Sequence, residues 1–72
     1  MTTATARTYE YRGHFIEVNA FNTGRWNGEA TICGPLTDSK PHVEVIRSHA
    51  TPGLAERAAR EWARRWIDLR CS

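Results

Sequence analysis

The chain has 72 residues, 40% of them hydrophobic and 25% charged, with a net charge of +2 at neutral pH. This length predicts one domain with a small core, and the balanced composition excludes wholesale disorder. No apolar run approaches the ~20 residues that cross a membrane, and the first residues lack the apolar stretch of a signal peptide. We therefore expect a cytoplasmic protein with no membrane partner, in which Cys33 and Cys71 are reduced thiols.

The positive charge is unevenly placed. Five basic and five acidic residues cancel within residues 1–50, so the whole excess falls on residues 51–72. Proteins that hold nucleic acid mainly through its phosphates usually carry a larger excess. Nucleic acid is therefore the weaker of the two partner classes considered below.

The Thr-rich segment 1–8 is expected to be a flexible tail, and residues 9–72 the folded domain. The run Tyr9–Phe21 has the aromatic and β-branched residues of a strand. The alternation of its apolar residues changes phase at Gly13. Tyr9 and Tyr11 before the glycine are odd-numbered, whereas Ile16, Val18 and Ala20 after it are even-numbered. A β-bulge at Gly13 would return both sets to one face. The competing interpretation is a tight turn at Arg12-Gly13 that divides the run into two strands.

The turn signal Asn22–Arg25 separates this run from the next strand, Trp26–Cys33. The second strand alternates well and places Trp26, Gly28, Ala30 and Ile32 on one face. A polar loop then leads to a third strand, His42–Ser48. From the alternation along this strand, we expect Val43 and Val45 to point inward, and His42, Glu44 and Ile46 to point outward.

One helix follows, from Pro52 to about Arg70. Thr51 is a suitable N-cap, and proline is favoured at the first helical position. At 100° per residue the apolar side chains form one broad stripe, and arginine and acidic residues occupy the opposite side. The stripe consists of Leu54, Ala55, Ala58, Ala59, Trp62, Trp66 and Leu69.

These elements predict an α+β fold in which a three-stranded antiparallel β-meander packs on one C-terminal helix, in the order βββα. One helix covers one face of the sheet, so the other face is left open. The expected core consists of Ile16, Val18, Trp26, Ala30, Ile32, Val43, Val45, Leu54, Ala58, Trp62, Trp66 and Leu69.

Three short motifs give the chain a family likeness: Tyr11–His14 before a strand, Gly24–Trp26 at the start of the next, and Arg65–Asp68 closing an Ala-rich helix. With these motifs, residues 9–68 resemble a loose group of small uncharacterised bacterial proteins that have three strands and a C-terminal Ala-rich helix. The resemblance implies this fold. It implies no activity, because the group has none assigned.

The open sheet face is the first candidate site. It is expected to carry the apolar residues Phe15, Phe21 and Ile46 among glutamates, on a surface that the helix cannot cover. A row of glutamates repels the phosphates of DNA, so this face does not suit a DNA-reading sheet. We expect a protein contact here, and self-association is one form of it.

The second candidate, and the alternative function, is weak binding of nucleic acid by Arg57, Arg60 and Arg64, which lie on one side of the helix. Interleaved acidic residues make a solvated face the simpler interpretation. The chain lacks the common nucleophile, phosphate-binding and zinc-protease motifs, so we expect no enzyme, cofactor or metal site. The leading hypothesis is a non-enzymatic protein-interaction module that uses the open sheet face or a sheet edge.

Overall fold

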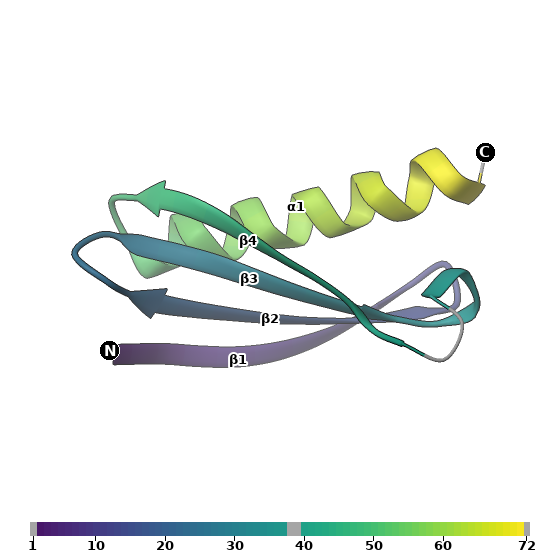
Figure 1. The fold of residues 1–72 in the computed structure, drawn as a ribbon, viewed down its shortest axis with the longest axis horizontal. Helices are drawn as coiled ribbons and strands as arrows, with labels where there is room; N and C mark the ends of the chain where they lie inside the picture. The colour runs from purple at the N-terminus through teal and green to yellow at the C-terminus, as the bar shows by residue number, and fades with distance from the viewer. Residues whose placement is uncertain (1, 38–39, 72) are drawn as a thin grey trace.

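The computed structural model describes residues 2–37 and 40–71. It consists of one antiparallel sheet in the order β1-β2-β3-β4 and a single helix that lies against one side of it (Figure 1). The elements are β1 (Thr2–Tyr11), β2 (His14–Asn22), β3 (Trp26–Cys33), the 3₁₀ helix η1 (Pro35–Thr37), β4 (His42–His49) and α1 (Pro52–Cys71). The α+β class is confirmed, whereas the expected count of three strands was wrong because the first run contains two.

A tight turn at Arg12-Gly13 divides that run. Both residues have positive φ, 49° and 78°, which is the backbone of a two-residue hairpin with a right-handed twist. Tyr11 pairs with His14 directly across the turn. The β-bulge expected at Gly13 was therefore wrong, and the competing interpretation of a turn is confirmed. The hairpin also explains the change of phase, since it brings the tyrosines and the aliphatic residues to the same face.

β1 begins earlier than we expected. Residues 2–8, which we took for a tail, form the first part of β1 and pair with β2, with a register shift between Thr3 and Ala6. Met1 lies outside the described residues. The segment has little apolar character, but threonine is β-branched and favours the extended backbone. An edge strand also needs no continuous apolar face, so hydrophobicity gave no signal for it.

The core lies between the helix and the middle of the sheet. Ile16, Val18, Ala30 and Ile32 are buried as expected. On α1, however, the buried residues are Ala55, Ala59, Ala63 and Ile67, spaced four apart. The stripe is therefore rotated from the expected one: Ala58, Trp62 and Trp66 are only partly buried, and Leu54 and Leu69 are 50% and 69% exposed. Trp26 on β3, which we also expected in the core, is partly buried as well.

Small residues let the helix lie close to β3. A Cβ at Gly28 would collide with the backbone carbonyl of Ala55 and lie 3.0 Å from Cβ of Ala59. The backbone of α1 thus fills the space beside Gly28. Thr51 caps the helix as expected, because its Oγ1 accepts a hydrogen bond from N–H of Leu54.

The residues of β4 that face the helix are the opposite set from the one that we expected. Gly28 pairs with Ile46, and Ile32 pairs with His42, so the even-numbered residues of β4 share the face that carries the helix. Val43 and Val45 therefore belong to the open face. The physical reason is the helix: the His42 ring stacks on both Trp62 and Trp66, at centroid distances of 5.6 and 4.9 Å. Two ring stacks and burial of Ile46 outweigh two valines on an edge strand.

One helix cannot cover four strands. A helix with its side chains is about 10–12 Å wide, whereas four strands span about 19 Å. α1 packs mainly on β3, and also on β2 and β4. The helix therefore leaves the open face of the sheet uncovered. On its own side of the sheet it leaves a groove between α1 and β1 and a hollow between α1 and β4.

Candidate interaction site

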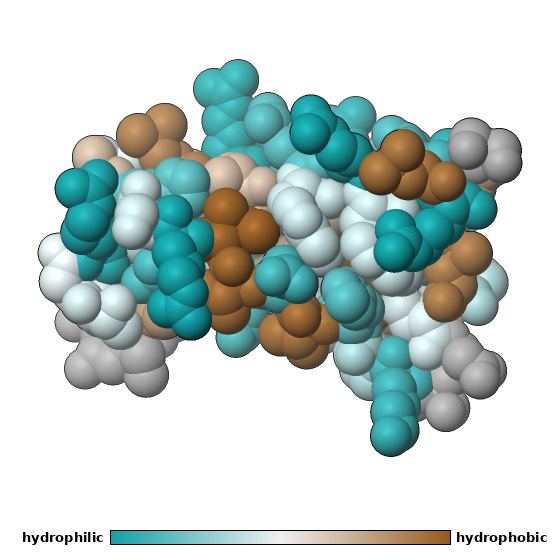
Figure 2. Space-filling model, turned by 45° about the horizontal axis from the view of Figure 1, so that its top comes forward, coloured by the Kyte–Doolittle hydropathy of each residue, from teal (hydrophilic) through white to brown (hydrophobic). Residues whose placement is uncertain are grey.

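The open sheet face carries the largest exposed apolar side chains of the described sheet. Phe15 is 55% exposed and Val43 50%, while Phe21 and Val45 are partly buried. Phe15 and Phe21 thus lie on the face where we expected them. Figure 2 shows exposed hydrophobic groups in small patches among hydrophilic ones, on the side of the molecule that comes forward from the top of Figure 1.

Ile46 does not belong to this surface. It pairs with Gly28 and packs against the core from the helix side, so its assignment as an outward contact residue was wrong. Together with Trp62 it lines a hollow of about 260 Å³ between β4 and α1. Val43 and Val45 take the place of Ile46 on the open face.

The open face is acidic. Glu10, Glu17 and Glu29 lie on β1, β2 and β3 with the parity of Phe15, and Arg47 follows the two valines on β4. Glu44, which we expected here, shares the helix side with His42. Three carboxylates on adjacent strands still disfavour contact with phosphates, so the argument against a DNA-reading sheet survives the change of residues.

The helix arginines do not form one free row. Arg57 pairs with Glu61 at 3.3 Å, and both side chains are largely exposed. Arg60 and Arg64 instead turn toward β1, where their guanidinium groups lie over the rings of Tyr9 and Tyr11, at 5.4 and 4.9 Å from the ring centroids. Two of the three arginines are therefore brought together against Tyr9 and Tyr11 of β1, a contact that was not predicted from the sequence.

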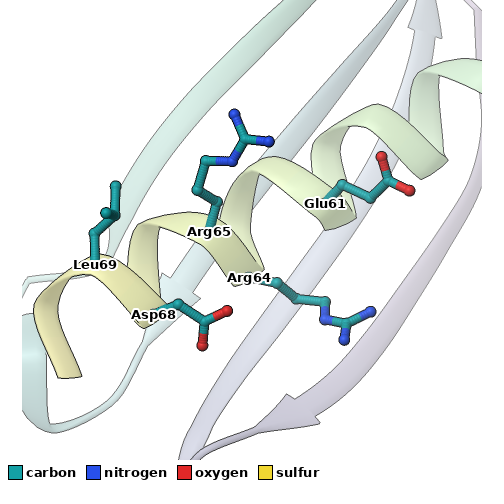
Figure 3. A pocket seen from close by; sticks show the side chains of 5 residues that line it. All are labelled: Glu61, Arg64, Arg65, Asp68 and Leu69. Atoms are coloured by element: carbon teal, nitrogen blue, oxygen red, sulfur yellow. The ribbon is translucent and has the colours of Figure 1, made fainter. Parts of the chain in front are cut away.

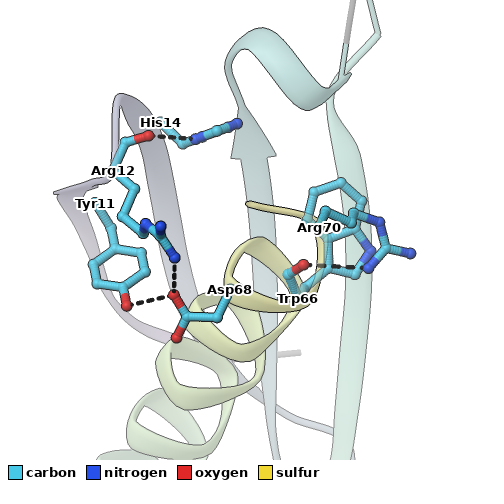
Figure 4. Close-up of polar contacts among 6 residues, drawn as sticks. All are labelled: Tyr11, Arg12, His14, Trp66, Asp68 and Arg70. Atoms are coloured by element: carbon cyan, nitrogen blue, oxygen red, sulfur yellow. Dashed lines mark hydrogen bonds and ion pairs between the residues drawn. The ribbon is translucent and has the colours of Figure 1, made fainter. Parts of the chain in front are cut away.

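Asp68 joins the end of α1 to the first hairpin. Its Oδ1 accepts hydrogen bonds from the Tyr11 hydroxyl at 2.7 Å and from Arg12 at 3.0 Å (Figure 4). The Tyr11 hydrogen bond, with that of Arg12 second, lowers the pKa of Asp68 below its ordinary value, and the same contact with Asp68 raises the pKa of Arg12. These two contacts hold the end of α1 against the first hairpin, at one end of the groove between α1 and β1.

We expect Asp68→Asn to lower the melting temperature near neutral pH, because the variant loses the charge that Arg12 faces. A carboxyl whose folded pKa is lowered stabilises the fold above its ordinary pKa, and that stabilisation disappears as pH falls through the folded pKa. Thermal melts at about pH 7 and about pH 2 should thus differ between the two proteins only at the higher pH. A difference that persists in acid would contradict this account, and Glu29→Gln is the control for a carboxylate outside the contact.

A further hollow of about 410 Å³ lies on the outside of α1. All five lining residues belong to the helix, and their side chains point apart, with Arg64 and Arg65 on opposite sides (Figure 3). This is a depression between neighbouring helix side chains, and no second element helps to enclose it. We do not regard it as a site.

Chemical sites are few in the part of the chain that the structure describes. No three histidine, cysteine or acidic side chains there are grouped to hold a metal ion. Cys33 and Cys71 are both exposed free thiols. Within residues 2–37 and 40–71, no helix is long and apolar enough to cross a membrane.

Comparisons with protein-family models, with curated proteins and with solved structures find no match for this chain. The functional argument therefore rests on the geometry of the open face and of the groove. The residues that we missed there are Val43 and Val45 on one surface, and Tyr9 and Tyr11 on the other. With a turn at Gly13, Tyr9 and Tyr11 fall on the same face of the sheet as Ile16. This was the one signal in the sequence that placed the tyrosines beside the helix.

Proposed function

We propose that this chain is a non-enzymatic interaction module that pairs with a second copy of itself through the open sheet face. The observation that carries the proposal is the exposure of Phe15 and Val43, each about half accessible, on the sheet face opposite α1, which no element among the described residues covers. As part of the same proposal, the module is cytoplasmic and its two thiols stay reduced.

The size of the open face suits a small dimer. Four strands of about eight residues make a surface of about 19 by 26 Å, or about 500 Å² in each copy. Two copies would bury about 1,000 Å², which is near the lower limit of specific interfaces. The dimer would then have four layers, helix, sheet, sheet and helix, with the sheets about 10 Å apart. Such an area favours a weak, reversible dimer.

The arrangement of polar residues makes the face complementary to itself. Glu17 pairs with Thr31 across β2 and β3, and Asn19 pairs with Glu29. Consider a two-fold axis between the two facing sheets, parallel to the strands and midway between β2 and β3. Each β2 residue then faces, in the second copy, the same β3 residue that it pairs with in its own sheet. Glu17 then meets a threonine hydroxyl and Glu29 meets an asparagine amide. Both groups donate hydrogen bonds to a carboxylate.

The same axis buries Phe15 against the second copy. Phe15 pairs with Cys33 within one sheet, so it would cover Cys33 of the second copy. Glutamate does not face glutamate at the centre of this arrangement, which removes the strongest objection to a dimer of an acidic face.

We expect Phe15→Glu to abolish the dimer and leave the fold intact, because Phe15 is exposed within the single chain. Leu54→Glu is the matched control, since Leu54 is 50% exposed on the helix and away from the sheet face. Size-exclusion chromatography with light scattering should give a monomer mass for the first variant and a dimer mass for the second. Equal masses for the two variants would rule out this interface.

A further inference from the structure

A continuous groove runs between β1 and α1, on the opposite side of the sheet from the proposed dimer contact. It comprises two hollows, of about 180 and 270 Å³, and both are lined by Tyr9 and Arg60. Arg7, Glu56 and Arg57 line one end, and Glu10, Tyr11 and Arg64 line the other. The groove exists because α1 lies over β2, β3 and β4 and leaves the inner side of β1 with less cover.

Two guanidinium groups of this groove, those of Arg60 and Arg64, form no ion pair with a carboxylate of the described residues, although Glu10 and Glu56 also line the groove. Each lies over one of the two tyrosine rings of the groove. Nε of Arg60 is buried, and no acceptor of the described chain reaches it. A buried guanidinium N–H without an acceptor is uncommon in proteins, and an anionic oxygen in the groove would satisfy it.

The flanking arginines can join these two. Arg7 lies 3.8 Å from Glu56, and Arg57 lies 3.3 Å from Glu61, and the arginine side chains in both pairs are more than 60% exposed. Pairs of this kind are worth about 0–1 kcal/mol and weaken with salt, so a phosphate can compete for the guanidinium. The groove therefore offers up to four guanidinium groups along its length.

We propose that this groove binds the phosphates of single-stranded nucleic acid, with Arg60 and Arg64 on neighbouring phosphates. The two residues are one helical turn apart, about 5–6 Å between Cβ atoms, and their tyrosines hold them in place. One guanidinium group can donate two parallel hydrogen bonds to the oxygens of a phosphate, and it can also stack on a base. The backbone of a duplex is convex and wide, so it does not follow a groove between a strand and a helix, whereas a single strand does.

This inference does not depend on the proposed dimer. The groove and the open face lie on opposite sides of the sheet, so each copy in a dimer keeps its own groove facing outward. The acidic open face would also direct a polyanion toward the helix side.

Fluorescence anisotropy with a labelled single strand of about 12 nucleotides tests the proposal at about 50 and 200 mM salt. The variant Arg60→Gln/Arg64→Gln should bind at least about tenfold more weakly than the unmodified protein. Its slope of log affinity against log salt should be smaller by about 1.4, since each phosphate contact on a single strand contributes about 0.7. Arg60→Lys, which keeps the charge and the tyrosine contact but not the paired hydrogen bonds, should bind with intermediate affinity.

Arg47→Gln is the control, because Arg47 is an exposed arginine of β4 outside the groove and the substitution removes one of the two charges that the double variant removes. It should change the affinity less than about twofold, and thermal melts show whether each variant is folded. Four results would overturn the proposal. The first two are no binding by the unmodified protein at the lower salt, and a loss of affinity in Arg47→Gln equal to that in Arg60→Gln/Arg64→Gln. The other two are binding of the matching duplex as tightly as the single strand, and displacement of the strand by an equal concentration of inorganic phosphate.

Discussion

Gly28→Ala is expected to destabilise the protein by about 3 kcal/mol or more, the largest effect of any single methyl group in this fold. The added Cβ would enter the space of the Ala55 carbonyl, which is helix backbone and cannot change rotamer to make room. The helix would have to move away from β3, and the alanine contacts of α1 would loosen along its length. For a domain of this size such a change lowers the melting temperature by roughly 12 °C or more.

Gly53→Ala is the matched control. No atom lies within 4 Å of a Cβ at Gly53, which sits in the first turn of α1. The same substitution should there be neutral or stabilise the fold by about 0.4–1 kcal/mol, because alanine restricts the unfolded chain more than glycine does. Thermal melts of the two variants check the close approach of α1 to β3, and similar melting temperatures would disprove it.

His14→Ala is expected to have the second largest effect, about 2–4 kcal/mol. The His14 ring is 2% exposed and joins the first hairpin to η1. Its Nε2 accepts a hydrogen bond from N–H of Leu36 at 3.2 Å, so Nδ1 carries the proton and donates to the Arg12 carbonyl at 3.0 Å (Figure 4). Alanine would leave a cavity and two backbone groups without partners.

His42→Ala provides the comparison for that result. The His42 ring stacks on two tryptophans but remains partly exposed, so its loss should cost about 0.5–1.5 kcal/mol. Chemical denaturation of both variants measures the two values directly. A smaller effect for His14→Ala than for His42→Ala would show that the His14 contacts do not hold the loop.

The helix and the two central strands were predictable from the sequence because the local signals agree there. Thr51-Pro52 marks the start of α1, and the alternation of Trp26–Cys33 matches a strand with one buried face. The rotation of the buried stripe toward Ala63 and Ile67 was not predictable from hydrophobicity. It follows from the close approach at Gly28, which selects small residues for the contact line and moves the tryptophans to its side.

The edge strands were harder to predict for a different reason. β1 is paired on one side only and carries threonines where a central strand has aliphatic residues, so its existence depends on the hairpin at Gly13. β4 presents two patterns of opposite parity, and the choice between them is made by Trp62 and Trp66, about 20 residues further along the chain. Such distant contacts cannot be read from alternation within a strand.

The candidate sites depended on the same two strands. Phe15 and Phe21 were placed on the open face correctly because β2 is central and its alternation is regular. Ile46 was assigned to the wrong face because the phase of β4 was wrong. The arginines of α1 were identified, but their position over tyrosines required the turn at Gly13, which the sequence left open against a bulge.

Sedimentation equilibrium of the unmodified chain, at roughly 0.1–1 mM protein in low and high salt, tests the central claim most directly. The proposed interface predicts twice the 8.2 kDa mass of the chain. Its contacts are apolar side chains and hydrogen bonds without ion pairs, and its glutamates repel at long range, so the dimer should not weaken as salt rises. A monomer at every concentration, or a dimer that dissociates in high salt, would contradict pairing through the open sheet face.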